Sequence, residues 1–496
     1  MNLAHLMDES LDRFGDERRT LFEGRAYGNA DIDQMAWRLA DLLVDAGVGR
    51  GDRVVVMMLN APEVSGVFLA CWRLGAVVVP LTPQWTAVEV AEVLSDCQPK
   101  FAFVSDETAG VMRSAAIAAR LDLAIQSLRP AETSIEKVHG RRSVAEVSAA
   151  DTALILYTSG TTGRPKGVVL GHANMMAATR MVYEPNRDLE GSRGLGVLPL
   201  SHIYGILMMN LGLMMGSRGV VLRHYDTTVM LETIQSFRVE QLSVVPTMMT
   251  YMLNHPELDR FDLSSLVTVS AGGAPLPEAL RSEFVDRIGC RVLQGYGMSE
   301  TAGVIAGYGS SDVYCPGSVG KAWAGSEIII LDDDGRPVAA GLRGEICVKG
   351  PQVMSAYLNR PEETASALAG GWLHTGDIGS LATDGHLTIA DRKKELIIKG
   401  GENISPREIE DALYGYPSVC EAAAFGVPDA VFGEQVVAAV VLRAGYSEDL
   451  GPLRAHLESC LMRFKQPIDI ILLDELPKGS NGKIKRRSAR DLYLGR

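Results

Sequence analysis

A short loop in the first third of the sequence gathers groups that can bind phosphate. The stretch 157–167, YTSGTTGRPKG, holds three glycines, four Ser or Thr hydroxyls and two cations. Glycine lets backbone N–H groups approach an anion closely, and hydroxyls can donate to phosphate oxygens. The residues that we expect to do so are Thr158, Ser159, Gly160, Thr161, Thr162 and Gly163, with Lys166 supplying positive charge.

The loop by itself leaves two interpretations open. Its spacing is not that of the P-loop, G-x-x-x-x-G-K-[ST]. A flexible surface loop rich in Gly, Ser and Thr is therefore the alternative to a phosphate site. The other motifs of the chain decide between them.

Six further motifs follow in order along the chain. They are PLSHIYG (199–205), SAGGAPL (270–276), QGYGMSE (294–300), HTGDIG (374–379), DRKKELIIKGGENISPREIE (391–410) and PKGSNGKIKR (477–486). Together with the loop they resemble the adenylate-forming synthetases, which include acyl-CoA and aryl-CoA ligases, luciferases and the adenylation domains of peptide synthetases. The resemblance spans nearly the whole chain. It implies that a carboxylate attacks the α-phosphate of ATP, and that a thiol, usually that of coenzyme A, then displaces AMP.

The resemblance also implies an ATP site. Tyr296 matches the aromatic side chain that stacks on adenine, while Asp377 and Arg392 match the ribose contacts. Ser299 would donate to the α-phosphate. The remaining nucleotide-binding positions implied are Gly272, Gly273, Ala274, Pro275, Gly295, Gly297 and Ile389.

Three residues carry the chemistry that the resemblance implies. Lys483 matches the lysine that bridges the acyl carboxylate and the α-phosphate, where an ammonium offsets growing negative charge. His202 would steer the substrate carboxylate. Glu300 matches a Mg²⁺ ligand, with Thr161 beside it, since a hard cation that bridges phosphates prefers oxygen ligands. Each residue also has a purely structural interpretation. Lys483 would belong to a solvated basic tail, His202 would be a core histidine, and Glu300 would be a carboxylate at the start of a helix.

The second half-reaction would use another face of the C-terminal region. Asp391 matches the hinge about which that region rotates. The segment containing Gly400, Gly401 and Glu402 would then border the channel for coenzyme A.

The acid is expected to be apolar, either aromatic or of medium chain length. Eleven of the twenty methionines lie between residues 175 and 252, and methionine suits adaptable apolar surfaces, although core packing explains many of them. The segments 203–215 and 244–252 contain no charged residue. The pocket residues implied are Tyr204, Met208, Met248, Gly273, Gly295, Ala302 and Gly303. An amine or a carrier protein remains an alternative acceptor.

The elements that must position these groups are those of an α/β protein. Short apolar runs at 52–59, 75–81, 101–106, 152–158 and 194–200 alternate with helical stretches, which predicts doubly wound, mostly parallel sheets. Thr86 with Glu89, and Ser405 with Glu408, have the spacing of a capping box, which predicts that a helix begins at each place. Asp-Gly turns at 317–390 predict a small β-barrel. We expect a large N-terminal domain over 1–390 and a small mobile α+β domain over 391–496.

Composition excludes several other classes of protein. The formal net charge is −13. The chain after residue 390 has 16 basic and 16 acidic residues, so the whole excess of negative charge lies in residues 1–390. A negatively charged chain of this kind does not suit a nucleic-acid binder. The longest apolar run, 203–216, is too short to span a bilayer. Seven isolated cysteines fit neither a disulfide framework nor a zinc site, and we expect a cytoplasmic monomer or homodimer.

Overall fold

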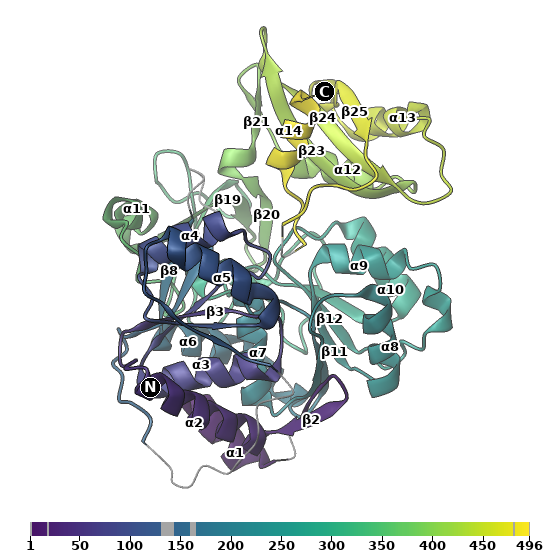
Figure 1. Ribbon diagram of the computed structural model, residues 1–496. Helices are drawn as coiled ribbons and strands as arrows, with labels where there is room; N and C mark the ends of the chain where they lie inside the picture. Colours follow the sequence, from purple (N-terminus) through teal and green to yellow (C-terminus); the bar gives the residue numbers. More distant parts are fainter. Residues whose placement is uncertain (1, 17–18, 130–142, 159–164, 480–481, 496) are drawn as a thin grey trace.

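The computed structural model describes residues 2–16, 19–129, 143–158, 165–479 and 482–495 (Figure 1). Within these ranges the chain forms two seven-stranded sheets, a smaller antiparallel sheet and a C-terminal α+β unit. The α/β class and the separate C-terminal unit that the sequence predicts are confirmed.

The first large sheet is mostly parallel and is covered by helices on both faces. Its strands, in spatial order, are β18 (Ala356–Tyr357), β8 (Lys166–Gly171), β7 (Thr152–Thr158), β4 (Val77–Pro80), β3 (Arg53–Met57), β5 (Phe101–Val104) and β6 (Ala124–Ser127). The helices that pack with it are α1 (His5–Phe14), α2 (Asn29–Asp45), α3 (Pro62–Leu74), α4 (Ala87–Cys97), α5 (Asp106–Ala118) and α6 (His172–Tyr183). Thr86 and Glu89 form the predicted capping box at the start of α4, where Glu89 Oε2 accepts from Thr86 N at 2.8 Å.

The second large sheet is also mostly parallel. Its strands, in spatial order, are β13 (Arg291–Gln294), β12 (Thr268–Ala271), β11 (Gln241–Val244), β9 (Arg193–Gly196), β10 (Arg218–Val221), β1 (Arg19–Phe22) and β2 (Arg25–Gly28). One face packs against α8 (Thr227–Phe237), α9 (Pro246–Leu253) and α10 (Glu278–Ile288), which share its apolar core. The predicted strand at 194–200 is shorter than expected. It ends at Gly196, and Pro199, which has no N–H to donate, lies in the turn before α7 (Ile203–Met215).

The predicted barrel region contains a four-stranded antiparallel sheet in its described residues. Its strands are β16 (Glu327–Leu331), β17 (Gly344–Lys349), β19 (Leu373–Leu381) and β20 (Leu387–Arg392). A short ribbon of β14 (Ala306–Gly307) and β15 (Lys321–Ala322) lies beside it, since Lys321 forms a bridge with His386. Helix α11 (Pro361–Ala367) precedes β19.

The C-terminal unit has its own sheet and core (yellow-green in Figure 1). Its strands are β21 (Ile397–Lys399), β22 (Glu402–Ile404), β23 (Val419–Asp429), β24 (Gly433–Leu442) and β25 (Asp469–Leu472), and its helices are α12 (Pro406–Tyr414), α13 (Gly451–Cys460) and α14 (Arg486–Leu494). Ser405 caps α12 as predicted, because its Oγ accepts from Glu408 N at 3.3 Å. None of the helices in the described ranges combines the length and apolarity that a membrane crossing requires.

Candidate active site

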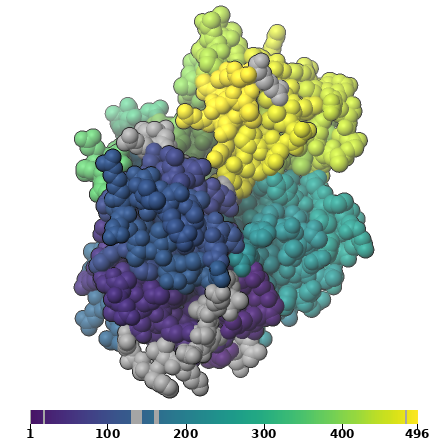
Figure 2. Space-filling model, viewed as in Figure 1, coloured from purple at the N-terminus to yellow at the C-terminus, as the bar shows by residue number. Residues whose placement is uncertain are grey.

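The candidate site lies where the C-terminal unit covers the carboxyl ends of β9, β11, β12 and β13. Figure 2 shows the C-terminal residues (yellow) resting on both halves of the larger part. A cavity of about 2230 Å³ runs from this junction into the larger part. Loops at the carboxyl ends of parallel strands are where open α/β sheets bind ligands.

The two ends of the glycine-rich loop face each other in a hairpin. Thr158 at the end of β7 pairs with Lys166 at the start of β8. Both residues line the cavity. The loop positions predicted for phosphate, Ser159, Gly160, Thr161, Thr162 and Gly163, lie outside the described residues. The structure therefore places the base of the loop at the cavity.

Glu300 lies close to the base of this loop. The residue is 8% exposed, and its Oε1 accepts a hydrogen bond from the Tyr357 hydroxyl at 2.8 Å. The Lys166 ammonium lies 5.3 Å from the centroid of the same tyrosine ring. Burial, followed by the charge of Glu300, raises the pKa of Tyr357 far above its usual value. A carboxylate and a cation thus share one aromatic neighbour beside the loop.

Tyr296, Asp377 and Arg392 form one connected group. The Tyr296 hydroxyl donates to Asp377 Oδ2 at 2.6 Å, and Arg392 Nε lies 3.1 Å from Asp377 Oδ1. Burial raises the pKa of Asp377, while the guanidinium and the phenol both oppose that rise. Tyr296 therefore meets two residues that lie 81 and 96 positions further along the chain, and all three are residues for which the resemblance implies nucleotide contacts.

Several glycines line the cavity near this group. Gly273 has φ +80°, which a side chain would strain, and a Cβ there would lie 3.4 Å from Lys483 Cε. A Cβ on Gly297 would meet the carbonyl oxygen of Gly303, so these two backbone segments touch. The other predicted nucleotide-binding positions that line the cavity are Gly272, Ala274, Pro275, Gly295, Ser299 and Ile389.

Lys483 and His202 lie on opposite sides of the same small space. Both line a pocket that also contains Gly273 and Tyr204. Burial, and then the positive charge of Arg392, lowers the pKa of Lys483 to about 8, against opposing effects of Asp377 and Glu300. Burial, with the charge of Lys483, lowers the pKa of His202 to about 3. The histidine is therefore a neutral imidazole at pH 7.

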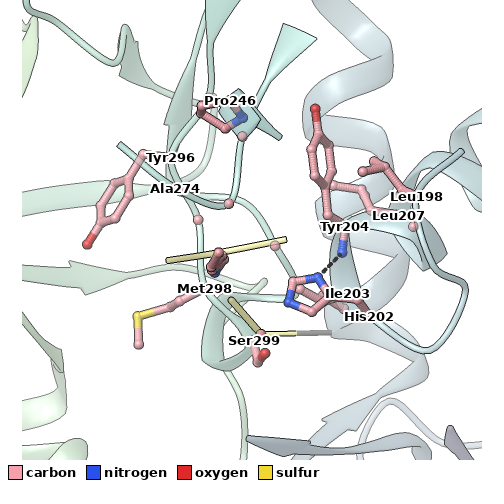
Figure 3. Close-up of a pocket in the computed structure, with 18 of the residues that line it drawn as sticks. Leu198, His202, Ile203, Tyr204, Leu207, Pro246, Ala274, Tyr296, Met298 and Ser299 are labelled. Carbon is pink, nitrogen blue, oxygen red and sulfur yellow. Dashed lines mark hydrogen bonds between the residues drawn. The ribbon is translucent and has the colours of Figure 1, made fainter. Parts of the chain in front are cut away.

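The backbone of α7 orients that imidazole. Tyr204 N donates to His202 Nδ1 at 3.4 Å, which favours the tautomer with its proton on Nε2 (Figure 3). In Figure 3 the ring extends from the start of α7 toward the loops that carry Ala274 and Ser299. The free ring nitrogen is thus available as a donor at the site.

Three side-chain contacts, two of them from the loop of Lys483 to α9, hold the C-terminal unit against the larger part, and the sequence did not reveal them. Thr247 Oγ1 donates to Gly482 O at 2.8 Å, and the Lys478 ammonium lies 5.4 Å from the Tyr251 ring centroid. Further away, Arg443 makes an ion pair with Glu283. These residues carry no local motif, since each contact joins segments at least 160 residues apart.

The predicted acyl-pocket residues separate into two groups. Tyr204, Met208, Gly273, Gly295 and Gly303 line the cavity. Met248 and Ala302 do not: Met248 packs in the core between the second sheet and its helices, and Ala302 is fully buried in the core of the first sheet. Helical spacing alone could not tell which methionines face a cavity.

Asp391 is buried at the end of β20 and holds the start of α12. Its Oδ2 accepts from Ser405 Oγ at 2.7 Å and from Arg407 N at 3.0 Å. The predicted channel residues Gly400, Gly401 and Glu402 lie on the β21–β22 hairpin and do not line the cavity in this arrangement.

Comparisons with known proteins show the family of the chain. The family model described as AMP-binding enzyme matches residues 7–358, and the model of the AMP-binding enzyme C-terminal domain matches residues 408–483. A feruloyl-CoA synthase of Amycolatopsis sp is 36% identical, covering 94% of each chain. A long-chain-fatty-acid–CoA ligase of Bacillus subtilis is 34% identical, covering 98% of this chain and 93% of its own.

Solved structures of one protein, MatB from Rhodopseudomonas palustris, are similar in two states. At 30% identity and 99% coverage of both chains, the ATP-bound form matches with a TM-score of 0.90. The apo form of MatB, with the same coverage, matches with a TM-score of 0.78. The arrangement described above is therefore more similar to that of the ATP-bound form.

Proposed function

The chain belongs to the family of AMP-binding enzymes and is an AMP-forming acid–CoA ligase, and we propose that it activates an apolar carboxylic acid by means of the residues described above. In the first half-reaction a carboxylate oxygen of the acid bonds to the α-phosphorus of ATP. The bond from that phosphorus to the bridging oxygen breaks, and pyrophosphate leaves. In the second, the sulfur of coenzyme A bonds to the acyl carbon and AMP leaves.

The nucleotide binds against the part of the cavity that Tyr296, Asp377, Arg392 and the glycines line. Tyr296 stacks on adenine, and the paired Asp377 and Arg392 hold the ribose hydroxyls, because a buried carboxylate already in place accepts without reorganisation. Ser299 and the loop that begins at Thr158 donate to the phosphates. Positioning supplies most of the rate enhancement of a reaction with crowded anionic oxygens.

Lys483 and His202 hold the reacting carboxylate. The Lys483 ammonium bridges it to the α-phosphate, and His202 donates a hydrogen bond from Nε2 to its second oxygen. Neutral imidazole suits this role, since it can donate without adding charge beside Lys483. The carboxylate is thereby aimed at phosphorus.

The site also fits Mg²⁺. Magnesium binds through one or two carboxylates plus substrate phosphates, and Glu300 is a buried carboxylate beside the phosphate loop. Among the described residues there is no cluster of three or more candidate ligands, which agrees with a metal carried in by the nucleotide. Glu300, and Thr161 of the loop, would hold it, and the ion would neutralise charge on the β- and γ-phosphates.

The thiol step requires a second arrangement of the C-terminal unit. We infer domains of 1–390 and 391–496, with the hinge at Asp391, where one strand end joins two units with separate cores. Rotation there would withdraw Lys483 and bring Gly400, Gly401 and Glu402 to the cavity.

The observation that carries this proposal is that Lys483, His202 and Gly273 line the same small pocket. The test is pyrophosphate release from ATP with a panel of acids and no acceptor, followed by product analysis after adding coenzyme A or an amine. Acid-dependent pyrophosphate release and an acyl-CoA product are expected. An amide product would show that an amine, and not coenzyme A, is the acceptor. Absence of pyrophosphate release with every acid would overturn the proposal.

A further inference from the structure

The two faces of the second sheet differ in the size of their side chains. The face toward α8, α9 and α10 carries buried Leu195, Leu242 and Val269. Residues next to these in sequence point to the opposite face and line the cavity. They are Gly194 and Gly196 on β9, Gly219 on β10, Ser243 on β11 and Ser270 on β12. Larger residues on the same face, Val221, Gln241, Thr268 and Leu293, also line the cavity, so the room beside this face lies at the glycines of β9 and at the start of β10.

Helix α7 forms the wall opposite this small-residue face. Tyr204, Met208, Leu211, Gly212 and Met215 line the cavity at helical spacing, and each except Met215 is less buried than its neighbours on the other side of the helix. That other side packs into the core of the first sheet. No residue of α7 carries a charge. The helix therefore presents an apolar stripe to the glycines and serines.

The cavity follows the whole length of this helix. α7 begins beside His202 at the carboxyl ends of the strands and returns the chain to the start of β10, so it runs opposite to β9. The lining continues from Lys483 at one end to Ser192 and Met215 at the other. From Tyr204 to Met215 the helix rises about 16 Å. An extended alkyl chain with bonds of ~1.5 Å advances roughly 1.3 Å per carbon, so about twelve carbons fit.

Two polar side chains along this path form hydrogen bonds within the protein. The Tyr204 hydroxyl donates to Ser270 O at 3.0 Å, and Ser243 Oγ donates to Met208 Sδ at 3.2 Å. Because these two groups have partners, an apolar chain beside them leaves neither hydroxyl unsatisfied. A single aromatic ring would fill only the end near Tyr204.

We propose that the acid is an unbranched fatty acid of about twelve carbons, whose tail lies between α7 and the glycine face of β9 and β10. This inference rests on the proposed function and names its substrate. Each methylene that enters the cavity gains about threefold to fourfold in kcat/KM. The gain stops where the tail reaches Met215.

The wild-type test is a series of straight-chain acids from four to eighteen carbons, with benzoate and a cinnamate for comparison, measured by pyrophosphate release. We expect kcat/KM to rise with length to about twelve carbons. A maximum at benzoate or the cinnamate, or no dependence on length, would overturn the proposal.

Two glycines allow the cavity to be blocked without disturbing the fold. A Cβ on Gly194 would meet only a backbone oxygen at 3.9 Å, and one on Gly219 would meet the Gly194 oxygen at 3.4 Å, both ordinary contacts. Valine also favours strands. In Gly194→Val and Gly219→Val we expect kcat/KM for dodecanoate to fall at least tenfold, and that for butanoate to change less than twofold. Gly110→Val, on α5 with open space around it, is the control and should change neither.

The outcomes separate the two proposals. Retained butanoate activity in the valine variants shows that they fold. No change for either acid would overturn the tail position alone, and so would an equal fall for both acids in variants whose urea unfolding matches that of the wild type. Absence of pyrophosphate release with every acid in the wild type would instead overturn the proposed function.

Discussion

Arg443, just after β24, and Glu283, on α10, form a two-pronged ion pair between the C-terminal unit and the larger part of the molecule. Nη1 lies 2.8 Å from Oε1 and Nη2 lies 2.7 Å from Oε2. The side chains are 27% and 29% exposed. Parallel hydrogen bonds of this kind fix orientation as well as distance. The pair thus holds the C-terminal unit in the arrangement that places Lys483 at the cavity.

Breaking this pair should slow adenylate formation. Because partly exposed pairs contribute modestly, we expect Arg443→Met or Glu283→Gln to lower the rate of pyrophosphate release about twofold to fivefold. Transfer from a preformed adenylate to coenzyme A, which needs the other arrangement, should be unchanged or faster. The exchange of both residues, Arg443→Glu with Glu283→Arg, should restore the rate. Equal slowing of both half-reactions would contradict the assignment.

Removal of the Lys483 ammonium should affect one half-reaction only. In Lys483→Ala we expect pyrophosphate release to fall by at least about a hundredfold, as for loss of a preorganised charge at a reacting centre. Thioester formation from the synthetic adenylate should persist. Lys485→Ala, two residues along and exposed, serves as the matched control. A comparable loss in both steps would show that Lys483 acts elsewhere.

The pH dependence of adenylation should follow Lys483. Its pKa is lowered to about 8, so the ammonium is present below pH 8 and is lost as pH rises above it. We expect kcat/KM for the first half-reaction to decline above about pH 8. Lys483→Arg, whose group stays charged, should retain low activity without that decline. If kcat/KM of the arginine variant declined above pH 8 as in the wild type, another group would be responsible for the decline.

The same shift has a consequence for stability with a definite sign. Between about pH 8 and the ordinary lysine pKa of 10.5, the unfolded chain holds a proton that the folded chain has released. The contribution of Lys483 to the free energy of unfolding therefore increases with pH across this window. Comparison of urea unfolding of the wild type and Lys483→Met would measure it.

A proline at Asp391 should restrict the second half-reaction. Proline fixes φ, so Asp391→Pro should slow thioester formation by about tenfold more than it slows pyrophosphate release. Asp391→Ala is the control, because it removes the carboxylate that holds Ser405 and Arg407 but leaves the backbone free. If the two variants behave alike, the effect belongs to the carboxylate and not to rotation.

Sequence alone was sufficient wherever a group is recognised by its neighbours along the chain. Ser405 and Glu408 predicted the start of α12, and the alternation of β-branched runs with helices predicted the sheets. The motifs around Tyr296, Asp377 and Lys483 resemble those of a known family, and the residues that the resemblance implies do line one cavity. Such motifs are local, so no knowledge of packing is needed to read them.

Tertiary structure decided what depends on contacts between distant segments. Nothing near Arg443 identifies Glu283 as its partner, and only packing separates Met208, in the cavity, from Met248, in the core. The alternating glycines Gly194 and Gly196 were visible in the sequence, but their meaning requires the helix that faces them. The chain determines which groups are present, whereas the empty space that they enclose exists only once the sheet and α7 have packed together.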